Sequence, residues 1–431
     1  MNSLWKYSPL ALLYFCLLFP ITSADYWWHI SAGREILEHG WIHQDFLSFP
    51  HFGKSWHNIH WLYQVITFAI HKYLGLIIAA LMKPLFIVGI IWIHLRLWKP
   101  SNPVVFLCFA GWALFPFRFL ALNRPTLFTL VILHLMIWVL VRQQGKAKWI
   151  SLSVLQILLA NLQGLFILGP ALVICYLVAE KSWKELKWIP LLYCVSMIHP
   201  LGVDTLIYPF KIWWRISIGA GLFSQHISEN APLWLSIERG HYVTSAFLMI
   251  GILSIVIYTL KSKCGSHTLM RFYQILVLPL SYLALTSQRN QLLWVLLMLP
   301  LVYHVFKEFF QKLNLKFTPL IRTQVQSILP MTMWITLAAL AIIHMNSWWA
   351  QASLKSEAPM RFPSQQILAR LNSVRIFNAD QYGGFIHFHT KHKVFIDGRF
   401  ILREPDFFSE YIEVLEDPQI WPQFQSKWGF G

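Results

Sequence analysis

The residues best placed to do chemistry lie in the polar stretch from Ser23 to Leu62, which follows an apolar run at the amino terminus. On a helix, Asp25, Trp28 and His29 would share one face, because they are three and four positions apart. A carboxylate beside a histidine can act as a general base toward an acceptor hydroxyl. The alternative is that Asp25 caps the helix and interacts favourably with its dipole. The two roles are compatible.

Asp45 is a second carboxylate of the same stretch. It is a candidate for orienting an acceptor or binding a cation. Its position before Leu47-Ser48-Phe49-Pro50 favours a turn residue instead, because Asp side chains bond to nearby backbone in turns.

Six histidines in this stretch raise the question of a metal site. His57 and His60 are three positions apart, and His39 and His43 are four apart, but neither pair belongs to an HExxH-like pattern. The spacing therefore does not support a divalent metal, and no cofactor is predicted. We interpret His57 and His60 as contacts to a substrate or to headgroups.

Three arginines outside the apolar runs, Arg34, Arg239 and Arg289, are candidate partners for an anion. A reaction that releases a lipid phosphate needs positive charge where the negative charge develops. Arg289 lies in a turn where no topological rule requires a basic residue. Contact with lipid headgroups is the alternative role.

The composition places most of the chain in a membrane. Of 431 residues, 56% are hydrophobic and 13% are charged, whereas a soluble domain carries about 25% charged residues. Apolar runs predict eleven membrane spans, near residues 8–22, 74–95, 103–121, 126–141, 148–160, 165–179, 188–200, 242–260, 272–286, 290–306 and 326–345.

The distribution of charge assigns the two sides of the membrane. Alternate turns carry sixteen basic residues but only three acidic ones, which is the pattern of cytoplasmic loops. The net charge of +16 therefore needs no nucleic-acid partner. The amino terminus is expected to be cytoplasmic, and residues 23–62, 199–241 and the tail from 346 extracytoplasmic. The first run also resembles a signal peptide, and its cleavage would leave the sidedness unchanged.

Local patterns predict the elements around these residues. Tyr26–His39 is expected to form a helix with Asp25 at its N-cap and Gly40 beyond its end. Trp61–Tyr73 and residues 207–218 are expected to be amphipathic helices at the membrane interface. The transmembrane domain is thus expected over 1–345.

Residues 346–431 are expected to form a small α/β domain. A helix at Phe362–Leu371 would precede a strand at 374–377, a further element in YGGFIHFH and a strand in KVFIDGRF. The Gly383-Gly384 and Asp397-Gly398-Arg399 motifs are interpreted as a tight turn and an internal ion pair. The fold has no obvious ending at Gly431, which is consistent with a truncated C-terminus.

Several motifs together resemble a bacterial group of large membrane proteins. They are DYWWHISAGREILEHG, HQDFLSFPHFGKSW, NRPTLFTL, ANLQGLFILG, HPLG, SQRNQLLWVLLMLP, FNADQYGGFIHF and KVFIDGRF, and they cover almost the whole chain. The group resembles the GT-C class of membrane glycosyltransferases, which use polyprenyl-phosphate sugars. Protein mannosyltransferases and the lipid A aminoarabinose transferase share this architecture.

The resemblance implies an essential acidic residue in the first outer loop, which corresponds to Asp25, and Asp45 matches a second acidic position loosely. The chain departs from the group at Asn58-Ile59-His60-Trp61-Leu62 and Asn161-Leu162-Gln163-Gly164, where relatives often carry another acidic residue and another histidine. A metal or acid/base role at these two positions is therefore in doubt.

The resemblance implies a glycosyltransferase of the bacterial inner membrane, in contact with membrane lipids. It would move a sugar from a polyprenyl-phosphate donor to an extracytoplasmic acceptor, which is a glycan, lipid or protein. Asp25 would be catalytic, and Trp28, His29, Arg34, Asp45, His57, His60, Arg239 and Arg289 would bind substrate, with one of the arginines stabilising the departing phosphate. The alternatives are a flippase for a lipid-linked saccharide and a non-catalytic scaffold with a degenerate site.

Overall fold

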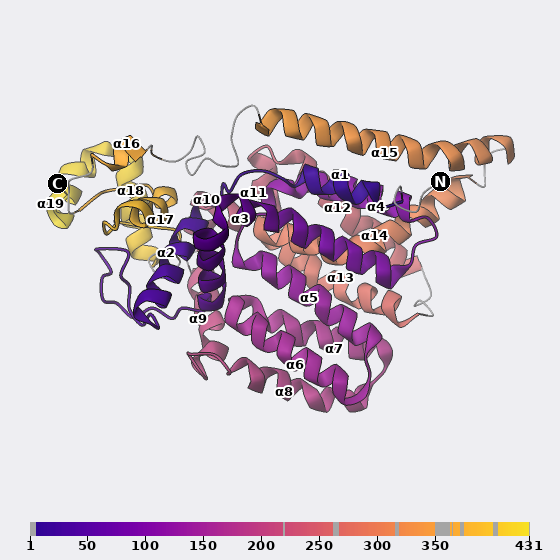
Figure 1. Cartoon of the computed structure of the whole chain (residues 1–431), viewed down its shortest axis with the longest axis horizontal. Coiled ribbons are helices and arrows are strands. Elements are labelled where there is room, and N and C mark those ends of the chain that lie inside the picture. Colours follow the sequence, from indigo (N-terminus) through magenta and orange to yellow (C-terminus); the bar gives the residue numbers. More distant parts are fainter. Residues whose placement is uncertain are drawn as a thin grey trace.

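The chain folds into a helical bundle with a cluster of shorter helices at one end (Figure 1). The computed structural model describes residues 6–218, 220–261, 267–314, 319–349, 363, 365–370, 375–399 and 404–430. The bundle contains α1 (Ser8–Cys16), α3 (Trp61–Trp98), α4 (Pro103–Leu114), α5 (Pro125–Arg142), α6 (Gly145–Leu162), α7 (Leu168–Glu180), α8 (Ile189–Ser196), α12 (Tyr242–Lys261), α13 (Thr268–Thr286), α14 (Gln291–Asn314) and α15 (Pro319–Trp349).

The remaining α-helices are α2 (Ala24–His39), α9 (Asp204–Ile218), α10 (Ala220–His226), α11 (Leu233–Glu238), α16 (Gln365–Leu368), α17 (Asp380–Thr390), α18 (Pro405–Glu416) and α19 (Trp421–Trp428). Short 3-10 helices are η2 (Phe115–Leu120), η3 (Gly164–Ile167), η4 (Trp183–Trp188), η5 (Ser228–Asn230), η6 (Gln288–Asn290) and η7 (Pro418–Ile420). Figure 1 places α2, α9 and the helices of the C-terminal tail at the same end of the bundle.

Seven helical segments in the described part of the chain are long and apolar enough to cross a membrane. They are Trp61–Trp98, Pro103–Leu120, Pro125–Arg142, Tyr242–Lys261, Thr268–Thr286, Gln288–Lys312 and Ile328–Asn346. The expectation of a polytopic helical membrane protein is confirmed at this level.

The predicted number of eleven spans is not supported, because four predicted spans fall in shorter or more polar helices. α1 has nine residues and α8 has eight. At 1.5 Å per residue, such helices reach only about 14 Å, against about 30 Å of hydrocarbon. α7 has 13 residues. α6 has 18 residues, but two lysines and other polar residues lower its hydropathy.

Helix α3 is divided by a kink at Gly75, whose φ of 82° and ψ of 172° are not helical. Glycine adopts a positive φ without the steric penalty that a side chain would add. The first part of α3 coincides with the helix predicted at Trp61–Tyr73. Both parts belong to the first of the long apolar segments, Trp61–Trp98.

Helix α2 forms where the sequence predicted a helix, and Gly40 follows it with a φ of 90°. It begins at Ala24, so Ser23 occupies the N-cap position and Asp25 lies in the first turn. The prediction that Asp25 is the N-cap residue is therefore wrong by two positions. Its carboxylate remains near the positive end of the helix dipole.

The C-terminal tail is helical where the sequence predicted an α/β domain. YGGFIHFH lies in α17, and the segments expected as strands make only isolated bridges, Ile376 to Val394 and Ser48 to Val394. The helix expected at Phe362–Leu371 overlaps α16, although parts of it and residue 374 lie outside the described residues. The apolar residues of α17 between the two expected strands pack against α2, and the strands themselves therefore pair only at single bridges rather than in a sheet.

Helices α2 and α17 approach each other closely at Gly384. A Cβ added at Gly384 would lie 2.6 Å from the backbone nitrogen of Trp28. At the adjacent residue of each helix, the rings of Trp27 and Phe385 make an edge contact with centroids 4.8 Å apart. The absence of a side chain at Gly384 therefore permits the tail to dock on the first loop.

We expect Gly384→Ala to lower the free energy of unfolding by about 1–3 kcal/mol, because overpacking displaces well-packed backbone. Thermal unfolding of the purified protein in detergent measures the effect. Gly221→Ala is the matched control, since an added Cβ there meets nothing within 4 Å. Equal melting temperatures for the two variants would contradict the close approach of α17 to α2.

Candidate functional site

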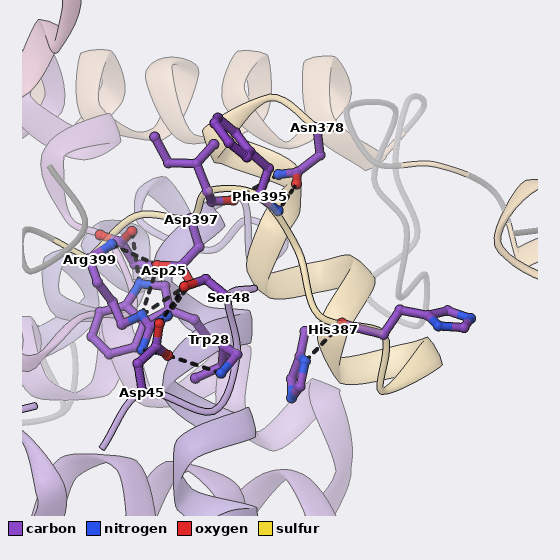
Figure 2. Close-up of polar contacts among 12 residues, drawn as sticks. Asp25, Trp28, Asp45, Ser48, Asn378, His387, Phe395, Asp397 and Arg399 are labelled. Carbon is purple, nitrogen blue, oxygen red and sulfur yellow. Dashed lines mark hydrogen bonds and ion pairs between the residues drawn. The ribbon is translucent and has the colours of Figure 1, made fainter. Parts of the chain in front are cut away.

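Asp25 lies at the end of the bundle, in the first turn of α2 (Figure 2). Arg124, the residue before α5, places its Nη2 3.0 Å from Asp25 Oδ2. Trp28 Nε1 donates a hydrogen bond of 3.1 Å to Asp25 Oδ1. Both carboxylate oxygens are therefore held by partners from different elements, which fixes the orientation of the group. The side chain of Asp25 still keeps 22% of its surface exposed.

Arg124 joins three segments of the chain. Its guanidinium pairs with Asp25 and with Glu229 of η5, and its Nε donates a 2.9 Å hydrogen bond to Ser23 Oγ. Burial alone would lower the pKa of Arg124, but the two carboxylates outweigh burial and raise it. Arg124 is therefore permanently charged, and the cluster of one cation and two carboxylates carries one net negative charge.

The tail covers one side of Asp25. A Cβ added at Gly398 would lie 2.0 Å from Asp25 Oδ1 and 3.1 Å from Trp28 Nε1. Only glycine allows the backbone of the tail to come this close to the carboxylate and its indole partner. The Asp397-Gly398-Arg399 motif is thus part of the wall around Asp25.

Asp45 lies in a buried ion cluster with the same motif (Figure 2). Arg399 Nη1 is 2.8 Å from Asp45 Oδ1, and Arg399 Nη2 is 2.7 Å from Asp397 Oδ2. The relative exposures of Asp45, Asp397 and Arg399 are 1%, 0% and 3%. The Arg399 guanidinium also stacks on the ring of Trp56, 4.6 Å from its centroid. Burial lowers the pKa of Arg399, but its two carboxylate partners raise it.

This cluster tests two interpretations from the sequence. The internal ion pair of Asp397 and Arg399 is confirmed. The turn role of Asp45 is also confirmed, because its Oδ1 accepts a 3.0 Å hydrogen bond from Leu47 N and its Oδ2 accepts one from Ser48 Oγ. The expected tight turn at Gly383-Gly384 is wrong, since both residues lie inside α17.

Asn378 holds the Asp397-Gly398-Arg399 segment from the other side (Figure 2). Its Nδ2 donates a 2.7 Å hydrogen bond to Ile396 O, and its Oδ1 accepts one of 2.9 Å from Phe395 N. A buried amide that satisfies the backbone of a strand-like segment substitutes for a missing sheet neighbour.

The histidines near Asp25 are buried. His29 stacks on Trp28 with ring centroids 3.5 Å apart, and His60 lies 5.6 Å from His29. Burial, His60 and Arg124 together hold the pKa of His29 below its usual range. Burial lowers the pKa of His60 to about 4. Both rings are therefore neutral at pH 7. No group of three His, Cys, Asp or Glu side chains suited to a metal occurs in the described ranges.

The remaining predicted site residues lie further out. His57 stacks on Tyr208 of α9, with centroids 4.6 Å apart. Arg34 donates a 3.2 Å hydrogen bond to Phe388 O of α17 and thereby supports the tail. The other two arginines also bind groups of the protein: Arg239 donates hydrogen bonds to Ser224 O at 3.1 Å and to Gln225 O, and Arg289 donates one to Asn230 Oδ1.

The structure thus brings Trp28 to Asp25, as their spacing on one helix predicted, and His29 stacks on Trp28. It adds Arg124, Glu229 and Gly398, which were not among the predicted site residues. The signal for Arg124 was present in the sequence: it is a basic residue on the expected outer side, directly before a span, as Arg289 is. Glu229 and Gly398 carry no local signal, because only the fold brings them to Asp25.

Comparison with known proteins supports the architecture. No family model matches the chain, and no curated protein matches it. Two structures of the oligosaccharyltransferase AglB of the archaeon Archaeoglobus fulgidus do match. One, tethered to an acceptor peptide with an NVT sequon, has a TM-score of 0.59 and 10% identity over 96% of this chain and 68% of that one.

The other, in complex with an inhibitory peptide and a dolichol-phosphate, has a TM-score of 0.58 and 11% identity over 95% and 68%. At this identity the likeness shows the fold alone. The chain therefore has the fold of a membrane oligosaccharyltransferase, which is the GT-C-like architecture that the motifs implied.

We expect Arg399→Gln to destabilise the docked tail by about 3–5 kcal/mol, because it leaves two buried carboxylates without a cation. Thermal unfolding and limited proteolysis of the tail measure the effect. Adding Asp45→Asn to this variant removes one of the two buried negative charges that have lost their cation, and should recover part of the lost stability. Failure of the second substitution to recover any stability would contradict the proposed pairing.

Acid should destabilise the tail through His387. Burial lowers the pKa of this histidine to about 4. Its unfolded value is about 6.5. Because the folded state disfavours the proton, stability falls as pH drops below 6.5, by about 2 kcal/mol between pH 7 and pH 5. Chemical unfolding at both pH values measures this loss, and His387→Gln should reduce it. An unchanged pH dependence in that variant would contradict the assignment.

Proposed function

We propose that the protein is a membrane glycosyltransferase that moves a sugar from a polyprenyl-phosphate donor to an extracytoplasmic acceptor. The observation that carries the proposal is the Asp25 carboxylate, oriented by Trp28 and Arg124 and partly exposed at the end of a GT-C-like bundle. One of the matching archaeal structures binds a dolichol-phosphate and the other an acceptor peptide. A lipid-linked donor and a peptide or other hydroxyl- or amide-bearing acceptor are consistent with this fold.

In the proposed reaction, Asp25 accepts a hydrogen bond from the attacking group of the acceptor. Arg124 stabilises the carboxylate of Asp25 as an anion. The main role of Asp25 is therefore to orient the acceptor and to take up the acceptor's proton as the bond forms. The acceptor atom bonds to the anomeric carbon of the sugar. The bond from that carbon to the phosphate oxygen breaks, and the phosphate leaves with the electron pair. The displacement inverts the configuration at this carbon.

The departing lipid phosphate needs a cation near the outer leaflet. Of the three predicted arginines, Arg289 has a contact next to the Asp25 cluster, because it binds Asn230, which follows Glu229 in the chain. Arg34 and Arg239 are engaged with backbone carbonyls of the tail and of α10. We therefore assign the phosphate contact to Arg289, and the support of the acceptor side to Trp28, His29, His57 and His60. Asp45 is buried and bonded through both carboxylate oxygens, so it has no such role.

We place the protein in a bacterial inner membrane with a cytoplasmic amino terminus. The support is the excess of basic residues in alternate turns. The first loop, α9 and the tail gather at one end of the bundle (Figure 1), as the assignment of all three to the extracytoplasmic side requires.

The test is turnover of polyprenyl-phosphate sugars by the purified full chain. We expect Asp25→Asn to lower the rate by about 10²–10⁴-fold, the usual contribution of a general base. Asp204→Asn is the matched control, because this carboxylate is exposed at the start of α9. Equal rates for wild type and Asp25→Asn would remove the role of Asp25. Absence of turnover with every donor would favour the scaffold instead.

A further inference from the structure

A second feature lies outside the Asp25 cluster, where α9 faces the beginning of α18. The two elements line an open cavity of about 650 Å³. Its volume is within the range of small-molecule binding sites, about 300–1,000 Å³. Its walls are Ile207, Phe210, Lys211, Trp214 and Arg215 from α9, and Pro405 and Asp406 from α18.

The residues from α9 form one face of the helix, because they recur every three or four positions. This face combines aromatic and basic side chains. Phe210 and Trp214 are 55% and 61% exposed, although both are large and apolar. Lys211 and Arg215 lie one turn apart on the same face. Exposed apolar surface of this kind marks a binding surface rather than a packed interface.

The position of α9 indicates what covers this face. Figure 1 places α9 at the same end of the bundle as α2 and the tail. The stacking of Tyr208 on His57 ties α9 to the first loop. Tryptophan side chains favour the boundary between acyl chains and headgroups, and neighbouring Lys and Arg favour anionic lipids.

We propose that this cavity binds an anionic phospholipid of the surrounding leaflet, with a phosphoglycerol headgroup. The phosphate would lie between Lys211 and Arg215, and an acyl chain would cover Phe210 and Trp214. Asp406 is the carboxylate among the lining residues, and it suits a headgroup hydroxyl as hydrogen-bond acceptor. Two cations against one carboxylate leave a net positive charge for the phosphate.

The proposed site is independent of the proposed enzyme activity. The seven residues that line the cavity do not include Asp25, Arg124 or Glu229. The bound lipid would join the membrane surface, the first loop and the tail, because α9 and α18 belong to different parts of the chain. We therefore expect it to affect tail docking without taking part in chemistry.

The experiment measures lipid retained by the full-length protein after purification from vesicles of equal phosphatidylglycerol and phosphatidylcholine, by mass spectrometry. We expect wild type to be enriched in phosphatidylglycerol. Lys211→Gln with Arg215→Gln should lower the enrichment about tenfold, as each basic residue contributes to anionic lipid binding. Trp214→Ala should lower the retention of the same lipid through loss of apolar contact.

The matched control is Lys54→Gln with Lys391→Gln, which removes the same charge from exposed positions away from the cavity. Equal losses in the two double variants would overturn the proposal, as would full retention in Lys211→Gln with Arg215→Gln. A third arm adds a polyprenyl phosphate at the concentration of phosphatidylglycerol. Its displacement of phosphatidylglycerol would assign the cavity to the donor lipid and would also overturn the proposal.

Discussion

The buried cluster of Asp45, Arg399 and Asp397 is the interaction on which the outer face of the molecule depends. It joins the first loop to a tail more than 350 positions later in the chain. Charges this deeply buried are tolerated only when their partners are all present, because each lost partner leaves an uncompensated charge. The tail therefore docks as a unit, and docking brings Gly398 onto the carboxylate of Asp25.

The environment of Asp25 follows from this arrangement. Its partners come from α2, from the turn before α5 and from the tail, and Arg124 extends the cluster to Glu229. A carboxylate held by an indole and a guanidinium cannot turn away from its position without losing both contacts. The orientation of the carboxylate is thus set by the fold, which is what the proposed role of Asp25 requires.

The local patterns in the sequence predicted individual helices better than they predicted how those helices pack together. The helix that carries Asp25 and the pair of Asp397 with Arg399 both follow from neighbouring residues. The spans were overcounted because an apolar run that packs inside a bundle resembles one that crosses lipid. The α/β tail was wrong because the segments expected as strands pair only at isolated bridges, while YGGFIHFH forms a helix whose Phe385 packs on Trp27 of α2.

The sequence by itself determined that the chain is a helical membrane protein and that Asp25, Trp28 and His29 lie on one helix. These properties depend on composition and on spacing within about one helical turn. Only the tertiary structure decided that Arg124, Glu229 and Gly398 surround Asp25 and that Asp45 pairs with Arg399. Contacts between segments hundreds of residues apart depend on the packing of the whole bundle, and no local pattern encodes them.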